Sequence, residues 1–144
     1  MPHQRRVSAS AGFSLIEMLV VLVIIGLIMG LVGPRVLAYL GDARVKAARL
    51  QIESFNNSLD LFHLDVGRYP TTQEGLTALV QRPAGTGVWN GPYLKGGSVP
   101  NDPWGNPYVY KIPGTKGPYD LISYGPTGRE GGQGSAGTIT NWQR

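Results

Sequence analysis

The feature that most constrains this chain is an apolar segment at residues 13–34 that contains one formally charged residue, Glu17. About 20 apolar residues at ~1.5 Å each are enough for a helix to cross a bilayer core of ~30 Å. A carboxylate in such a segment costs roughly 2.5–3.5 kcal/mol on insertion scales, so its presence indicates a function. The segment therefore predicts a membrane-spanning helix whose glutamate meets a partner.

Two other interpretations of the apolar segment fit less well. A secretory signal has an apolar region of ~7–15 residues followed by a small-residue cleavage site. Here the run is longer, contains Glu17 and continues into Pro34 and Arg35 without such a site. A buried core helix is disfavoured because residues 35–144 are too polar and too rich in glycine and proline to enclose it.

Past the segment, the pattern predicts that the helix continues. Apolar or small residues recur at alternating steps of three and four from residue 38 to residue 66, which indicates one helical stripe. We expect the stripe to pack on the chain's own sheet and residues 35–50 to pack on neighbouring copies, although a coiled coil also fits. Pro34 is expected to bend or break the helix, and Gly67 to end it. The stripe consists of Val45, Ala48, Ile52, Phe55, Leu59, Phe62 and Val66.

The remainder of the chain is built differently. From residue 67 onward lie 16 of the 21 glycines and 9 of the 11 prolines, which predicts turns and short strands. Thr71 and Glu74 form a capping-box pattern before a short helix over residues 75–80. Strands are expected at 108–112 and 119–124. The expected fold is α+β, with the long N-terminal helix packed on a small antiparallel sheet with long loops.

The residues at the start of the span identify a family resemblance. A basic leader containing Arg5 and Arg6, followed by Gly12-Phe13-Ser14-Leu15-Ile16-Glu17, resembles the type III signal of type IV pilins and pseudopilins. The resemblance implies the fold of that family, the type IV pilin-like fold. It also implies that a prepilin peptidase cuts between Gly12 and Phe13 and that Phe13 is then N-methylated.

The same resemblance gives Glu17 a role in assembly. Cleavage leaves an α-amine on Phe13, and an unpaired carboxylate in lipid is costly. Pairing with the amine of a neighbouring subunit therefore favours assembly and sets the register. The alternative is that Glu17 folds back on its own amine or stays hydrated.

Motifs further along narrow the resemblance to the major pseudopilins of type II secretion. That resemblance implies a homopolymer that grows from the inner membrane and pushes folded exoproteins through an outer-membrane secretin, together with minor pseudopilins and an inner-membrane assembly platform. It places the C-terminal domain in the periplasm. The positive-inside rule disagrees, because residues 35–49 carry more basic residues than the leader. The motifs are Tyr69-Pro70-Thr71-Thr72-Gln73-Glu74-Gly75-Leu76, Asp102-Pro103-Trp104-Gly105, Tyr119-Asp120-Leu121-Ile122-Ser123, Gly125-Pro126-x-Gly128, Glu130-Gly131-Gly132 and Asn141-Trp142.

One departure concerns calcium, which the family commonly binds through two aspartates in the last loop. Thr127 and Thr138 stand at those positions. Calcium takes ~6–8 oxygen ligands and draws on carboxylates for charge. Glu130 and Asp120 would have to compensate, so calcium is the less favoured of two possibilities, and an ion-free loop held by hydrogen bonds from the two threonines is the other.

Four segments follow: a leader (1–12), a transmembrane and filament-core helix (13–34), its amphipathic periplasmic half (35–66) and a globular region (67–144). No enzyme motif is present, and the chain has no cysteine.

The net charge of +4 falls to +2 without Arg5 and Arg6, because 11 basic residues then stand against 9 acidic ones, so nucleic acid is not expected as a partner. A type IV pilin for adhesion, motility or DNA uptake, or a membrane-anchored periplasmic binding module, remain alternatives.

Overall fold

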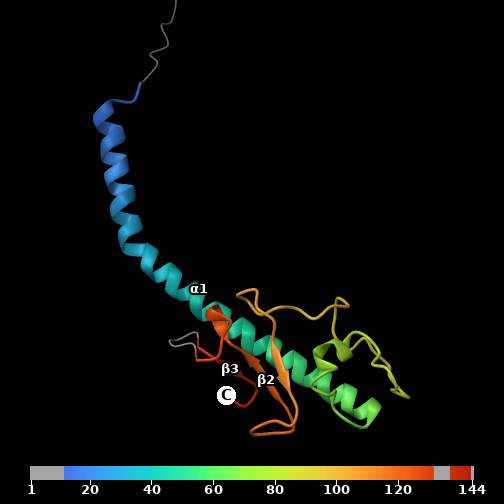
Figure 1. Cartoon of the computed structure of the whole chain (residues 1–144). Helices are drawn as coiled ribbons and strands as arrows, with labels where there is room; N and C mark the ends of the chain where they lie inside the picture. The colour runs from blue at the N-terminus through green and yellow to red at the C-terminus, as the bar shows by residue number, and fades with distance from the viewer. Residues whose placement is uncertain (1–11, 132–136, 144) are drawn as a thin grey trace, which may run out of the picture. The chain divides into compact units, whose positions relative to one another are not determined.

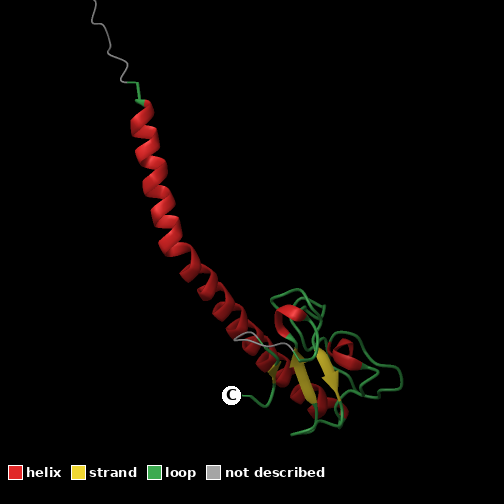
Figure 2. Ribbon diagram, turned by 60° about the vertical axis from the view of Figure 1, so that its left-hand side comes forward, coloured by secondary structure: helices red, strands yellow, loops and turns green. Residues whose placement is uncertain are grey.

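The computed structural model describes residues 12–131 and 137–143. They divide into two compact units that meet at Ala38 and Tyr39, and each unit is described by itself. The leader residues 1–11, including Arg5 and Arg6, lie outside the described residues. Figure 1 labels the main elements and Figure 2 shows helices, strands and loops. The elements are α1 (Leu15–Val66), η1 (Gly75–Leu79), β1 (Val109–Lys111), β2 (Asp120–Ser123), η2 (Gly125–Thr127) and β3 (Ile139–Thr140).

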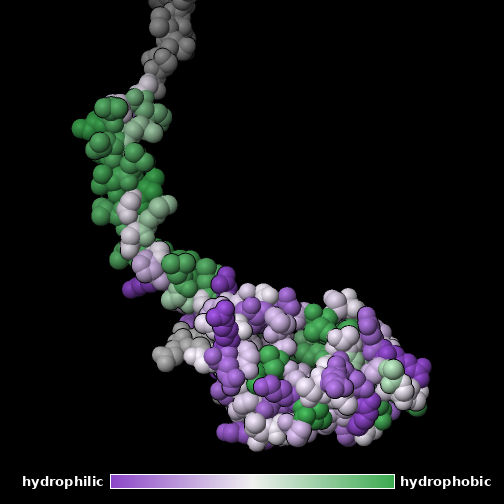
Figure 3. Space-filling model, in the orientation of Figure 1, coloured by the Kyte–Doolittle hydropathy of each residue, from purple (hydrophilic) through white to green (hydrophobic). Residues whose placement is uncertain are grey.

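The first unit consists of the N-terminal part of α1. Its large apolar side chains are exposed, and they give this part of the helix its continuous hydrophobic surface in Figure 3. Among the described residues, α1 is the one helix long and apolar enough to cross a membrane. The predicted spanning helix is therefore confirmed as a helix of suitable length and composition.

Of the bend or break expected at Pro34, the break does not occur, because α1 continues through the proline. Proline removes one backbone hydrogen bond, and its ring crowds the carbonyl four residues earlier, which here belongs to Gly30. The helical hydrogen bonds on both sides remain. Gly30 and Gly33 also add no side chain to the turn that the ring must fit, so the helix passes the proline.

The second unit begins with the rest of α1, which packs on the sheet (Figure 1, Figure 2). The predicted stripe is confirmed, because its central members are buried and Val45 and Val66 pack against the same core. The ring of Phe55 meets that of Tyr108 edge-on, with centroids 5.0 Å apart. The packing of α1 on the chain's own sheet therefore holds for this part of the helix. The buried members are Ala48, Ile52, Phe55, Leu59 and Phe62.

α1 ends where the sequence predicted. Gly67 follows the last helical residue with φ +84°, a left-handed conformation in which a side chain is strained. Its N–H donates to the carbonyl of His63 (2.8 Å), which satisfies one of the carbonyls left free at the helix end.

The sheet is antiparallel, with strand order β1-β2-β3. Val109 of β1 pairs with Ile122 of β2, and Ile122 pairs with Thr140 of β3. β1 and β2 confirm the two expected strands, although each is shorter than predicted. All four residues of β2 are buried, so this strand shows no alternation. β3 was not predicted, because two residues are too few to show a strand pattern.

The capping box after α1 is confirmed. Thr71 N–H donates to Glu74 Oε2 (2.8 Å), and Glu74 N–H donates to Thr71 Oγ1 (3.2 Å). The short helix that follows is η1, a 3-10 helix, and not an α-helix. Gly75 has φ +59°, so an α-helix cannot run from the box into residues 75–79.

Candidate functional site

The predicted processing and assembly residues lie at the start of α1. Gly12 and Phe13 precede the helix without regular structure, and both are exposed. Phe13 is 83% exposed, which is unusual for a phenylalanine beside a folded element. Among the described residues, no side chain therefore covers the peptide bond between Gly12 and Phe13.

Glu17 forms a reciprocal hydrogen-bond pair with Ser14. The backbone N–H of Ser14 donates to Glu17 Oε2 (3.3 Å), and the backbone N–H of Glu17 donates to Ser14 Oγ (3.3 Å). This capping box satisfies two of the free N–H groups at the helix N-terminus. Within the described chain, Glu17 thus bonds a backbone amide three residues away and holds no cation.

The surroundings of Glu17 are apolar. An open groove is formed by Phe13, Ile16, Val20 and Val21 beside the carboxylate. A charged group among such side chains gains from a cation when water is excluded, because the Coulomb attraction rises as the dielectric constant falls. The arrangement suits pairing with an amine brought by another chain.

Sequence reasoning missed Ser14. The signal was available, since serine followed three residues later by glutamate is the same pattern that predicted the box at Thr71 and Glu74. The alternative, in which Glu17 folds back on the α-amine of its own Phe13 or stays hydrated, remains a prediction, because the bond to Ser14 involves a backbone amide and not that amine.

The last loop does not bring together the acidic groups that calcium needs. Asp120 is buried, and its Oδ1 accepts from the N–H of Thr115 (2.9 Å) and from Thr115 Oγ1 (3.3 Å), so it holds the turn before β2. Glu130 is exposed. Among the described residues no three His, Cys, Asp or Glu side chains gather as metal ligands. The described part of the loop therefore presents no cluster of carboxylates to a calcium ion.

Hydrogen bonds occupy part of the same loop. Thr127 Oγ1 lies 3.3 Å from the carbonyl of Tyr124 and 3.2 Å from that of Arg129, and it accepts from Arg129 N–H at 3.4 Å. Gly128, at the end of η2, adopts φ +64° with the side chain of Asn106 against it. Thr138 lies just after residues 132–136, which fall outside the described residues.

The motif residue Asp102 is structural. It is 5% exposed, and its Oδ1 accepts from the N–H groups of Trp104 (3.1 Å) and Asn106 (2.8 Å). Its Oδ2 accepts from Ser123 Oγ at 2.7 Å, which ties the loop to β2. Asn141 acts similarly, accepting from Leu121 N–H and donating to the Tyr119 carbonyl, both at 3.1 Å.

Ionisable side chains near the C-terminal end of α1 also have structural partners. His63 stacks on Tyr69 with centroids 4.5 Å apart, and Tyr69 donates its hydroxyl to Asp60 (2.9 Å). Tyr93 donates its hydroxyl to Asp65 at 2.7 Å. Burial raises the pKa of Tyr93, and the hydrogen bond to Asp65 raises this pKa further. These contacts tie the end of α1 to the loops that follow it.

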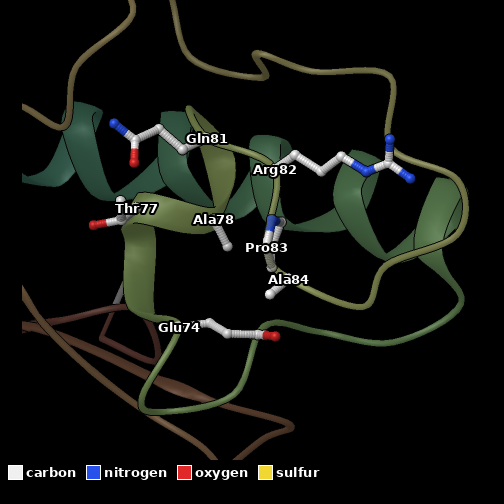
Figure 4. A pocket seen from close by; sticks show the side chains of 7 residues that line it. All are labelled: Glu74, Thr77, Ala78, Gln81, Arg82, Pro83 and Ala84. Carbon is white, nitrogen blue, oxygen red and sulfur yellow. The ribbon is translucent and has the colours of Figure 1, made fainter.

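A small cavity of about 220 Å³ lies beside η1 and is drawn in Figure 4. Its two charged lining residues point to different sides, and both are already paired. Glu74 holds Arg68 (2.8 Å), and Arg82 donates to the carbonyls of Thr86 (2.6 Å) and Gly87 (2.9 Å). The cavity therefore offers no free charged group to a substrate.

Two family models and several known proteins are similar to this chain in sequence. The family model described as "Type II secretion system (T2SS), protein G" matches residues 35–142, and the "Prokaryotic N-terminal methylation motif" matches residues 7–33. The chain is 47% identical to type II secretion system core protein G of Pseudomonas aeruginosa over 143 residues, covering 96% of this chain and 98% of that protein. It is 40% identical to the protein of the same name from Vibrio cholerae, covering 96% and 95%.

A solved structure gives the same result for the fold. The crystal structure of the major pseudopilin from the type 2 secretion system of enterohaemorrhagic Escherichia coli is similar, with a TM-score of 0.63 and 30% identity. The similarity covers 74% of this chain and 92% of that one. The expected type IV pilin-like α+β fold is thereby confirmed.

Proposed function

This chain belongs to the family of type II secretion system protein G, and from that premise we propose that it is the major structural subunit of a type II secretion pseudopilus. The observation that carries the proposal is the order of the two matches. The methylation motif covers residues 7–33 and the protein G family follows over residues 35–142. The chain does its work by assembling into a filament, as a structural subunit and not as an enzyme.

We propose that a prepilin peptidase cuts between Gly12 and Phe13 and that Phe13 is then N-methylated. The methylation motif supports this processing, and both residues are exposed just before α1 begins. The product starts at Phe13 and keeps the whole apolar helix. Intact mass tests the step: the mature chain lacks residues 1–12 and carries one extra methyl group.

We propose that residues 13–34 anchor the unassembled subunit in the inner membrane, with the C-terminal domain in the periplasm. The exposed apolar surface of this part of α1 supports a single membrane anchor. The orientation is taken from the family, against the charge balance of the flanks. Protease added to spheroplasts should digest the globular region and leave the span.

In the filament, Glu17 pairs with the α-amine of Phe13 from a neighbouring subunit. Both groups lie in apolar surroundings, where an isolated charge costs more than a charge that has a partner. The capping box with Ser14 gives the carboxylate a hydrogen-bond partner before a neighbour arrives. Assembly then exchanges one amide donor for a cation, which favours correctly registered subunits.

The partners of such a subunit follow from its place in the secretion machinery. We propose contacts with copies of itself, with minor pseudopilins at the filament tip and with an inner-membrane assembly platform. Growth of the filament pushes folded exoproteins through the secretin. Lipid contacts along residues 15–34 are replaced by contacts with neighbouring helices as each subunit is extracted.

We propose that hydrogen bonds, and not calcium, hold the last loop. The engagement of Asp120 by Thr115 and of Thr127 by its own loop supports this. A chelator should shift the thermal unfolding midpoint of the calcium-treated protein by less than about 1 °C. A drop of several degrees, reversed by added calcium, would show that a metal site is present.

The alternatives from the sequence are not favoured. A type IV pilin shares the methylation motif, but the protein G family match covers the globular region as well. A binding module on an uncleaved anchor requires residues 1–12 to be retained, which intact mass excludes or reveals.

The test of the function is a strain that lacks this gene, compared with the strain complemented by the wild-type chain. Exoproteins should accumulate in the periplasm of the deletion strain and return to the medium on complementation. An unchanged set of secreted proteins with loss of surface fibres, twitching or transformation would overturn the proposal in favour of a type IV pilin.

A further inference from the structure

An exposed face of α1 lies just beyond the membrane span and combines apolar with basic side chains. Tyr39 is 75% exposed and Leu50 is 72% exposed, Lys46 is exposed beside them, and the exposed Arg49 lies at the border of this face toward Ile52. At 3.6 residues per turn, Tyr39, Lys46 and Leu50 fall within about 40° of one another around the helix. Ala48, which packs into the core, lies on the opposite side, and the buried Ile52 lies about 120° around the helix from Lys46. We call Tyr39, Lys46, Arg49 and Leu50 the outer face.

The charges of the outer face have no partner within the described chain. The one ion pair among the described residues joins Arg68 and Glu74. Lys46 and Arg49 therefore have no carboxylate within salt-bridge distance. Asp42 lies one turn before Lys46, and Glu53 lies one turn after Arg49 and further from the span, so both lower the positive charge of the face.

Charges of opposite sign are sorted along α1 by their distance from the span. Residues 35–49 carry four basic residues and one acidic residue, whereas residues 50–66 carry three acidic residues and no lysine or arginine. The helix dipole does not explain this order, because it disfavours acidic residues near a helix C-terminus. The acidic residues are Glu53, Asp60 and Asp65, and the basic ones are Arg35, Arg44, Lys46 and Arg49.

We propose that the outer face binds the anionic phospholipid headgroups of the bilayer that holds the span, before the subunit enters the filament. Basic side chains next to a membrane segment are attracted to an anionic surface. Exposed tyrosine and leucine beside them suit the boundary between headgroups and acyl chains. The face continues directly from the membrane anchor, and the acidic residues that an anionic surface would repel lie further along.

Headgroup binding requires the outer face to lie close to the bilayer surface. Lys46 is twelve residues past Pro34, about 18 Å along a helix, whereas charges are screened beyond about 8 Å at physiological salt. Residues 39–50 must therefore lie along the bilayer surface in this state. Pro34 interrupts the backbone hydrogen bonds of α1 between the span and the outer face, so it is the natural place for the change of direction.

The inference rests on the membrane anchoring proposed above. It adds a state in which the unassembled subunit is bound to the lipid surface before it enters the filament. A subunit held on the lipid surface keeps its outer face away from other copies. Entry into the filament then has to exchange headgroup contacts for contacts with neighbours. The strength of the lipid contact would set how readily subunits leave the membrane.

The test uses the mature full chain in nanodiscs. Because the chain has no cysteine, Ala43→Cys gives one labelling site at the edge of the outer face. A fluorophore there is quenched by lipids that carry a nitroxide on the headgroup. Quenching should be at least threefold stronger in discs that contain phosphatidylglycerol than in phosphatidylcholine discs, and 0.5 M salt should remove the difference. A fluorophore at the exposed position 64 (Leu64→Cys), in the acidic part of α1, should show a smaller difference in quenching between the two lipids.

Two pairs of substitutions make the test specific. Lys46→Gln with Arg49→Gln should bring the ratio between the two lipids close to one. Lys111→Gln with Lys116→Gln removes the same charge from β1 and the turn after it, and should leave the ratio unchanged.

Quenching of equal strength in both lipids would overturn the inference. A signal that rises with the number of chains per disc would also overturn it, because the outer face would then bind a second copy of the chain. A chain that fails to enter the discs would instead overturn the anchoring itself.

Discussion

The two parts of α1 share one secondary structure and differ in what covers them. Between residues 15 and 38 the apolar side chains point outward on all sides, and Leu27 is 71% exposed. Between residues 39 and 66 one stripe of apolar side chains is buried, with Leu59 and Phe62 fully so, while others such as Leu50 and Leu64 stay exposed. The second part is folded by its own sheet, whereas the first depends on lipid or on other copies of the chain.

That difference has a functional consequence. The C-terminal part can be optimised for a single packed state, because the residues it contacts belong to the same chain. The N-terminal part has to be compatible with two environments in turn, first the bilayer and then the filament core. The apolar segment 13–34, with Glu17 as its one ionisable side chain, meets both demands, since it packs non-specifically in lipid and specifically where Glu17 finds a cation.

The largest expected effect is on the folded half. Phe62→Ala removes a fully buried ring that meets Tyr93 edge-on, with centroids 5.9 Å apart. Such a truncation in a core costs about 3–5 kcal/mol of unfolding free energy. Thermal or denaturant unfolding of the full chain in detergent, followed through the aromatic signals of the globular unit, measures it.

Two controls sharpen the comparison. Leu64→Ala is two residues away on the exposed side, where Leu64 is 78% exposed, and should change stability by less than about 0.5 kcal/mol. Leu27→Ala lies in the span and should leave the unfolding of the globular unit unchanged. If Leu27→Ala destabilised that unit as much as Phe62→Ala does, the two parts of α1 would not be independent.

The second prediction concerns the N-terminal part of α1, where a substitution should affect assembly and not folding. Glu17→Val should insert, lose its leader and keep the unfolding midpoint of the globular unit. Secretion of exoproteins should fall by at least tenfold, because the carboxylate that pairs with a neighbouring amine is missing. Secretion assays and crosslinking of filaments measure the loss.

Glu17→Gln separates the two roles of the carboxylate. Glutamine can replace glutamate in a capping box, so the hydrogen bonds with Ser14 remain while the charge is lost. If charge pairing drives assembly, the glutamine variant fails as the valine variant does. If it secretes normally, the capping box is what matters and the pairing is wrong.

The comparison also explains what the sequence could predict. The span and the stripe from Val45 to Val66 were predictable because each is a long pattern set by one physical requirement, burial in lipid or burial on a sheet. β3 and the 3-10 form of η1 were not, because two residues and one glycine with positive φ carry no periodicity. At the candidate site, Glu17 was predictable from its cost in lipid, but its bond to Ser14 required attention to a weaker local pattern.

A third, smaller effect concerns the polar interior of the globular unit. Asp102→Ala removes an acceptor for three hydrogen bonds, and leaves the N–H of Asn106 and the hydroxyl of Ser123 without this partner. Buried donors without an acceptor cost about 1–3 kcal/mol, so a loss near that range is expected in denaturant unfolding. Asn101→Ala, on the neighbouring exposed side chain, should cost little. Equal losses would show that Asp102 has no special structural role.

The smallest prediction concerns pH and again touches only the folded unit. The bidentate hydrogen bond from Arg68 (2.8 and 2.9 Å) holds the pKa of Glu74 below its usual 4.5, and the capping bond from Thr71 adds to it. Because the folded pKa is the lower one, this contribution is complete above the unfolded pKa and is lost as the pH falls through the folded pKa. The pair is 43% and 21% exposed, so it is worth at most about 1 kcal/mol.

Glu74→Gln should therefore lower stability slightly at pH 7 and not at pH 3, since glutamine does not titrate. Denaturant unfolding at both pH values tests this sign. The Arg68–Glu74 pair lies after α1, so the span should show no corresponding change in helicity by circular dichroism. A difference between wild type and variant that grew toward pH 3 would mean that the carboxylate is stabilised by protonation. The ion pair would then not be what joins the end of α1 to η1.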